Sequence, residues 1–139
     1  MRYLGLDLGT KTLGVAVSDK TGLIATSLTI LRHDNDYDFL IEELKKIIKE
    51  KEIETIVLGL PKNMNNTIGE RANATILFKE KLENKVNIPI VLEDERLTTK
   101  IAESTLIREN NLSRKKRKKI IDGTSAVIIL QSYLDRRER

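Results

Sequence analysis

Residues 1–19 read MRYLGLDLGTKTLGVAVSD and contain the pattern that decides the fold. Residues 2–8 and 13–19 are apolar and β-compatible, and the short GTKT connection between them, which contains Gly9, suits a β-hairpin. Asp7 lies inside the first apolar run, between Leu6 and Leu8. Moving an ionised carboxylate out of water is costly unless a cation meets it. The position therefore predicts either a cationic partner or less burial than the pattern indicates.

The rest of the chain extends this hairpin into a larger sheet. Residues 23–31 follow the second strand too closely for a crossover, which predicts an antiparallel meander. Beyond it, segments with helical apolar spacing alternate with short buried-type runs. The further predicted elements are helix 36–51, strand 54–60, helix 68–85 with Ala72, Ile76 and Leu77 on one side, strand 88–94, a helix capped by Thr98 or Thr99 that ends near Arg108, and a last helix from near Lys118 to about Asp135.

This order of elements predicts an α/β fold. Strands connected through helices lie parallel, with right-handed crossovers. We therefore expect a mixed five-stranded sheet, made of a three-strand antiparallel meander plus two parallel strands, flanked by helices. The first strand would be central, with the second on one side and the fourth on the other. The carboxyl ends of the parallel strands are where such sheets place ligands.

Length and composition indicate one globular domain. The 139 residues suit a single domain, 1–139, and the balance of 40% hydrophobic and 33% charged residues is typical of globular proteins. No apolar run approaches the roughly 18 residues of a membrane span, and we expect no signal peptide. With 0 Cys the natural location is a reducing cytoplasm, and His33, the one histidine, is expected at the surface, which leaves little for a zinc site.

Acidic residues stand at positions where the predicted fold brings segments together. Asp7 ends the central strand, the acids at 93–95 end the last strand, and Asp122 lies near the start of the final helix, before Gly123. Gly123 weakens a helix, which is tolerated more readily where something large approaches the backbone. If these acids converge, they repel each other and bind protons or cations. Mg²⁺ prefers such oxygen ligands, and two ions about 3.5–4 Å apart can hold both oxygens of a phosphodiester displacement.

Each acid also has a simpler interpretation. Asp7 would cap the turn that follows it, residues 93–96 would form a solvated and self-paired turn, and Asp122 would interact with the dipole of its helix. Asp19 is expected to be a turn residue. Strand parity puts the side chains of Glu93 and Glu95 on the same side, so spacing does not choose between them.

A basic run gives the second candidate surface. Residues 114–119, RKKRKK, are six basic residues in a row in a chain of net charge +4. Such blocks are often only solvated. However, cations at a helix start oppose the helix dipole, and a nucleic-acid backbone would offset that cost. The candidate nucleic-acid-binding residues are Arg114, Lys115, Lys116, Arg117 and Lys118 in the run, with Lys11, Lys62 and Arg96 around the acids.

Four segments together carry a resemblance that covers nearly the whole chain. GLDLGTKTLGVAVSD, VLGLPKNMNN, EDERLTT and IDGTSAVIILQSYLD resemble, in order, the motifs of the YqgF family of Holliday junction resolvase-like nucleases, also called RuvX. The resemblance implies a ribonuclease H-like fold, Mg²⁺ or Mn²⁺, and catalytic, metal-binding acids at Asp7, Glu95 and Asp122. It also implies a nucleic-acid substrate, either a Holliday junction or the 5′ end of precursor 16S rRNA. Thr124 and Ser125 stand where a fourth acid would be sought, so the number of metal ions stays open.

Two other functions compete with this interpretation. The segment LGLDLGTKT also resembles the phosphate-binding hairpin of sugar kinases, Hsp70 and actin, which clamp a nucleotide between two such domains, whereas 139 residues have room for one. The other alternative is a non-catalytic nucleic-acid-binding or ribosome-associated module, against which the intact acidic set argues. The sequence does not choose between RNA and DNA or between branched and linear substrates. Junction resolution would require a twofold homodimer.

Overall fold

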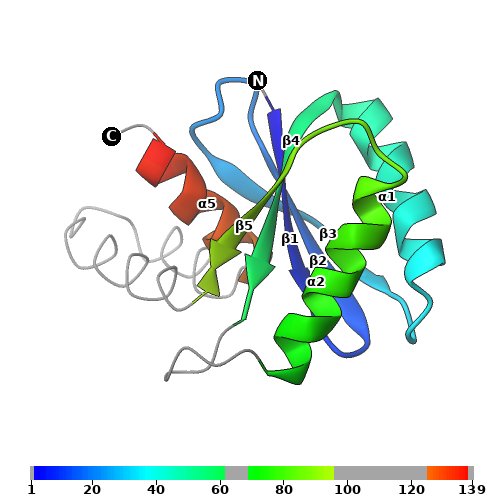
Figure 1. Cartoon of the computed structure of the whole chain (residues 1–139). Coiled ribbons are helices and arrows are strands. Elements are labelled where there is room, and N and C mark those ends of the chain that lie inside the picture. Colours follow the sequence, from blue (N-terminus) through cyan, green and yellow to red (C-terminus); the bar gives the residue numbers. More distant parts are fainter. Residues whose placement is uncertain (1, 62–68, 96–124, 138–139) are drawn as a thin grey trace.

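A mixed β-sheet forms the centre of the computed structural model, which describes residues 2–61, 69–95 and 125–137 (Figure 1). Its strands are β1 (Arg2–Leu8), β2 (Thr12–Ser18), β3 (Ala25–Arg32), β4 (Ile53–Leu60) and β5 (Ile90–Asp94). The helices are α1 (Tyr37–Lys51), α2 (Glu70–Glu83) and α5 (Ser125–Arg137). The predicted helix 98–108 and the part of the last helix before residue 125 lie outside the described residues.

The sheet has the predicted topology. Its five strands run in the order β3-β2-β1-β4-β5, with β1 antiparallel to β2 and parallel to β4. Because β1, β4 and β5 are parallel, their carboxyl ends meet at one edge, where α2 also begins (Figure 1). The prediction of a central first strand and of a meander plus two parallel strands is confirmed.

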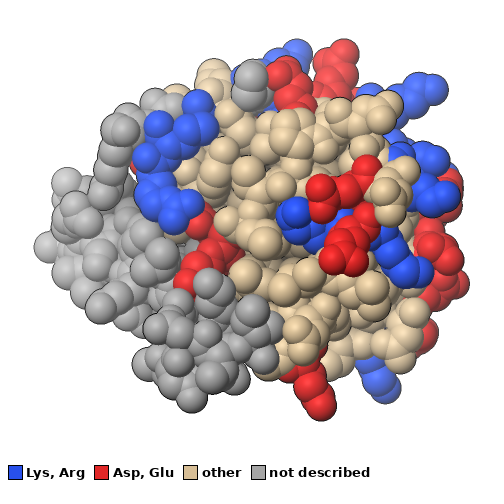
Figure 2. Space-filling model, viewed as in Figure 1, with Lys and Arg blue, Asp and Glu red and all other residues tan. Residues whose placement is uncertain are grey.

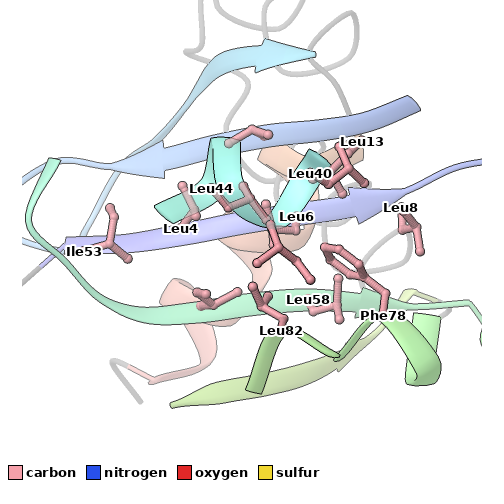
Figure 3. Packing of buried hydrophobic residues seen from close by; sticks show 13 residues of the cluster. Leu4, Leu6, Leu8, Leu13, Leu40, Leu44, Ile53, Leu58, Phe78 and Leu82 are labelled. Atoms are coloured by element: carbon pink, nitrogen blue, oxygen red, sulfur yellow. The ribbon is translucent and has the colours of Figure 1, made fainter. Parts of the chain in front are cut away.

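Helices cover both faces of the sheet, and each face has its own apolar core. Leu4, Leu6 and Leu8 of β1 point toward α1 and α2, where they pack with residues such as Leu40 and Phe78 (Figure 3). The residues between them on β1 face α5. This alternation along a strand explains why an almost continuously apolar segment is buried on both sides.

The close approach of α5 to the sheet depends on a glycine. A Cβ added to Gly5 of β1 would lie 2.6 Å from Leu130 Cβ and 3.0 Å from the carbonyl oxygen of Ala126. No side chain fits there, so α5 lies directly against the central strand.

The structure corrects the predicted face of α2. Ala72, Thr75, Phe78 and Leu82 are buried, whereas the Leu77 side chain, predicted to share the face of Ala72, is 50% exposed. At 3.6 residues per turn, five positions place Leu77 about 140° around the helix from Ala72. The helix therefore buries a stripe of mixed polarity that the apolar pattern did not reveal.

The expectation that His33 lies at the surface is wrong. Its side chain is buried, with Nε2 3.0 Å from the carbonyl oxygen of Gly9, while Nδ1 accepts a hydrogen bond from the Asn35 backbone N–H. Since Nδ1 accepts, Nε2 carries the proton and donates to Gly9. His33 thereby ties the turn after β1 to the start of α1.

The prediction for Asp19 is confirmed. Its carboxylate accepts hydrogen bonds from the backbone N–H groups of Leu23 and Ile24 and from the Thr21 hydroxyl, as a turn residue does. Among the described helices, none is long and apolar enough to span a membrane.

Candidate active site

Asp7 lies on the α5 face of the sheet, near the carboxyl end of the central strand. Its register partner on β2 is Gly14, and it is two residues after Gly5, which touches α5. Ser125, the first residue of α5, donates a side-chain hydrogen bond to the Asp7 carboxylate. The strand alternation and the start of α5 thus place the carboxylate between the sheet and the helix.

The Asp7 carboxylate is partly buried and incompletely satisfied. Its Oδ1 atom is shielded from solvent and accepts no hydrogen bond from any residue that the structure describes. Burial raises the pKa of Asp7, while the nearby Arg71 guanidinium and the Ser125 hydroxyl act in the opposite direction. A buried carboxylate oxygen without a donor is a position that a cation would satisfy.

Glu95 lies close to Asp7, at the carboxyl end of β5. It follows directly after β5, and its side chain lies over Gly59 of β4, where an added Cβ would be 3.3 Å from Glu95 Cγ. Burial, and then the negative charge of Asp7, raise the pKa of Glu95 to about 7. The two carboxylates are therefore close enough to repel each other, as a pair that shares a cation does before the cation binds.

Glu93 has a different environment from Glu95, although both side chains share a face. The Glu93 side chain is 1% exposed, and its Oε1 is 2.5 Å from Nη2 of Arg136, at the far end of α5. Burial raises the pKa of Glu93, and Arg136 partly offsets this. The geometry thus favours Glu95 as the partner of Asp7, and it excludes a fully solvated turn at 93–95.

Figure 2 shows the charges at this edge of the molecule. Lys and Arg atoms gather over the C-terminal end of α5, beside Asp and Glu atoms at the carboxyl end of β5. The arrangement agrees with the Arg136–Glu93 ion pair.

Arg71, in the first turn of α2, is a site residue that sequence reasoning missed. Its Nη2 lies 3.6 Å from Asp7 Oδ1 and donates a 3.2 Å hydrogen bond to the Leu8 carbonyl oxygen. Its positive charge also lowers the pKa of Glu95. One signal was present in the sequence, because a cation in the first turn of a helix opposes the helix dipole and so indicates an acidic partner.

Of the other predicted site residues, the structure describes Lys11 alone. Lys11 is exposed in the turn after β1. Asp122, Lys62, Arg96 and residues 114–118 lie outside the described residues, although Asp122 precedes Ser125 by three positions in the sequence. Within the described ranges, no group of three or more acids, histidines or cysteines is arranged to hold a metal.

The two described acids are chemically suited to a hard divalent cation. Carboxylate oxygens are the ligands that Mg²⁺ and Mn²⁺ prefer, and Mg²⁺ is usually held by one or two protein carboxylates. The Asp7–Glu95 pair and the unsatisfied Asp7 Oδ1 fit that requirement.

Comparison with known proteins places the chain in a family. The family model described as "RuvX: Holliday junction resolvase" matches residues 1–136. The chain belongs to the RuvX family. Relatives from Listeria monocytogenes serotype 4b (strain CLIP80459) and Bacillus subtilis (strain 168) are each 53% identical to it over 136 residues. These matches cover 97% of this chain and 98% of each relative, and both relatives carry the name "Putative pre-16S rRNA nuclease".

Solved structures confirm the expected ribonuclease H-like, resolvase-type fold. Thermus thermophilus RuvC in complex with a Holliday junction substrate is 13% identical, with a TM-score of 0.67 over 99% of this chain and 96% of that one. The yeast mitochondrial Holliday junction resolvase Ydc2 is 15% identical, with a TM-score of 0.56 over 95% and 77%. A ROK hexokinase from Thermus thermophilus is 22% identical, with a TM-score of 0.52, but the match covers 38% of its chain. This chain therefore shares its fold with these resolvases and with part of the ROK hexokinase.

Proposed function

We propose that this RuvX family protein is a divalent-metal-dependent endonuclease that hydrolyses phosphodiester bonds in structured nucleic acid. The observation that carries the proposal is the meeting of Asp7 and Glu95 at the carboxyl edge of the parallel strands. Relatives at 53% identity that are named for pre-16S rRNA support this precursor as the substrate, and we propose that its 5′ end is the part that is processed. The family description supports a Holliday junction as the second substrate class.

In this proposal Asp7 and Glu95 hold Mg²⁺ or Mn²⁺, and Asp122 is the third ligand. Held by these acids, a divalent ion would supply activation of a water molecule and would offset negative charge on the phosphate. Ser125 fixes the Asp7 carboxylate through a hydrogen bond, which leaves the buried Oδ1 available as a ligand. Both acids lie at the ends of strands, so the sheet fixes their positions. A metal site requires ligands that are held in place in this way.

The substrate would be held by positive charge around this site. Lys11 is exposed beside the end of β1, and Lys62, Arg96 and residues 114–118 are proposed to contact the phosphate backbone from neighbouring segments. Such contacts give affinity that does not depend on base sequence. We also propose that the protein acts in the cytoplasm, and as a twofold homodimer if the substrate is a junction.

A cleavage panel tests the function. The purified protein is incubated with a transcript of the 5′ precursor region of 16S rRNA, a four-way DNA junction and a linear duplex, in Mg²⁺, Mn²⁺ or EDTA at fixed salt. We expect cleavage of the transcript that requires the metal and is lost in Asp7→Asn. Cleavage of the junction instead would identify the second substrate class. Tight binding of all substrates in Ca²⁺, together with no cleavage of any of them in Mg²⁺ or Mn²⁺, would overturn the nuclease proposal in favour of a binding module.

A further inference from the structure

Arg71 lies beside the Asp7 oxygen that the proposed metal would bind. Its guanidinium lies 3.6 Å from Asp7 Oδ1, the oxygen that accepts no hydrogen bond from the described residues. It also acts electrostatically on Glu95. A single positive charge therefore offsets two carboxylates, which a divalent cation would match more fully.

The Arg71 side chain is held by few contacts. The side chain is 51% exposed, and it contacts the described part of the site through an ion pair longer than a hydrogen bond and through one hydrogen bond to the Leu8 carbonyl oxygen. The helix that carries it packs against the rest of the molecule, because Ala72 and Thr75 are buried. The guanidinium can thus leave Asp7 while α2 keeps it at the edge of the site.

A divalent ion on Asp7 would repel the Arg71 guanidinium. A phosphate group of the substrate would then become the partner of the guanidinium. Arg presents a planar fork of donors that matches a phosphate in bidentate fashion. Arg71 lies in the first turn of α2, 3.6 Å from Asp7 Oδ1, so a phosphodiester bound at the Asp7–Glu95 pair would lie close to its guanidinium. The first turn of a helix also favours an anion there.

We propose that Arg71 is an exchangeable counter-ion: it neutralises Asp7 and Glu95 while no metal is bound, and it transfers to the substrate phosphate when the metal binds. The identity of the substrate rests on the proposed function, but the exchange itself does not require cleavage. The exchange predicts opposite effects of removing Arg71, because Arg71 competes with the metal and cooperates with the nucleic acid. A purely structural ion pair would not produce these opposite signs.

The first half of the test is metal binding without nucleic acid. Free Mn²⁺ is measured by electron paramagnetic resonance during titration of wild type, Arg71→Gln and Lys81→Gln. Lys81 is the matched control, because it is on the same helix and pairs with Asp38 at 3.8 Å, on α1. We expect Arg71→Gln to bind Mn²⁺ about three- to tenfold more tightly and Lys81→Gln to bind like wild type. Unchanged or weaker Mn²⁺ binding by Arg71→Gln would overturn the proposal.

The second half is nucleic-acid binding in Ca²⁺, measured with the precursor 16S transcript. Arg71→Gln should bind about tenfold more weakly, since a charge-assisted contact to phosphate is lost, whereas Lys81→Gln should change little. Arg71→Lys keeps the charge but not the fork, so it should bind Mn²⁺ like wild type and the transcript more weakly. It also serves as the second variant if Arg71→Gln folds poorly by circular dichroism. Wild-type transcript affinity in both Arg71 variants would contradict the transfer step. If Arg71→Gln shows both effects but the wild-type protein cleaves none of the substrates, the nuclease proposal alone is overturned.

Discussion

Replacing Glu95 with Gln should stabilise the metal-free protein at alkaline pH. Burial and the charge of Asp7 raise the pKa of Glu95 from 4.5 to about 7, so the folded chain holds this carboxylate in an unfavourable charged form at pH 8. A shift of this size corresponds to about 3 kcal/mol in the free energy of unfolding. Water screens part of this unfavourable interaction because the side chain is only partly buried. We therefore expect the free energy of unfolding of Glu95→Gln to be about 1–2 kcal/mol higher than that of wild type.

The sign of the pH dependence follows from the direction of the shift. Between pH 4.5 and about 7 the folded state binds more protons at Glu95 than the unfolded state does. The contribution of Glu95 to wild-type stability is therefore fully present below pH 4.5 and is lost as the pH rises through about 7. Gln imitates the protonated form, so the advantage of the variant should be largest at pH 8 and should vanish toward pH 4.5.

Urea unfolding in EDTA at several pH values measures this difference. The variant and wild type should have the same slope with urea, so that the midpoints compare free energies of unfolding directly. Glu80→Gln, an exposed substitution of the same type on α2, is the control and should show no such pH-dependent gain. A Glu95→Gln protein that is less stable than wild type at pH 8, or whose advantage is equal at both ends of the range, would refute the close approach of Glu95 to Asp7.

Other substitutions test the metal site, the packing of α5 and the basic run. Asp7→Asn should abolish Mg²⁺-dependent cleavage and leave the urea midpoint of the metal-free protein equal or higher, because one charge of a repelling pair is removed; cleavage at the wild-type rate would exclude Asp7 as a ligand. Gly5→Ala should lower the free energy of unfolding by about 1–3 kcal/mol, since the new Cβ would lie 2.6 Å from Leu130 Cβ; an unchanged thermal midpoint would contradict that contact. Gln at residues 114–116 should flatten the slope of log K against log[salt] by up to roughly 2–3 units; an unchanged slope would show that the run is a solvated block.

Local patterns predicted the sheet well because its strands are set by short-range features. The apolar run at 2–8 became β1 with those bounds, and the tight connections after it enforced the meander. The position of Asp7 at the carboxyl end of a central strand followed from the same pattern. These features depend on the pattern of apolar residues along a strand and on the length of the connections, and both can be read from short stretches of sequence.

The features that local patterns did not reveal depend on contacts between distant segments. His33 is buried with its Nε2–H donating a hydrogen bond to the carbonyl oxygen of Gly9, on another turn, and no local pattern shows such a partner. Glu93 and Glu95 have the same strand parity, and partners on other elements distinguish them. Arg136 of α5, 43 positions further along the chain, pairs with Glu93, whereas the charge of Asp7 on β1 acts on Glu95. Arg71 became part of the site through the packing of α2 beside β1. Hydrogen bonds and ion pairs between residues of different elements are thus the part of a site that is hardest to predict from a single sequence.

The central claim, that the carboxylates at this sheet edge hold a divalent ion against the scissile phosphate, is tested most directly by sulfur substitution. Once the cleaved bond of the precursor transcript has been mapped, a non-bridging oxygen of that phosphate is replaced with sulfur, in each stereoisomer separately. Sulfur is a soft ligand that Mg²⁺ accepts poorly and Mn²⁺ accepts better. We predict that one stereoisomer is cleaved slowly by wild type in Mg²⁺ and that Mn²⁺ restores most of its rate. Equal slowing of both stereoisomers in both ions would contradict direct contact between the metal and the phosphate.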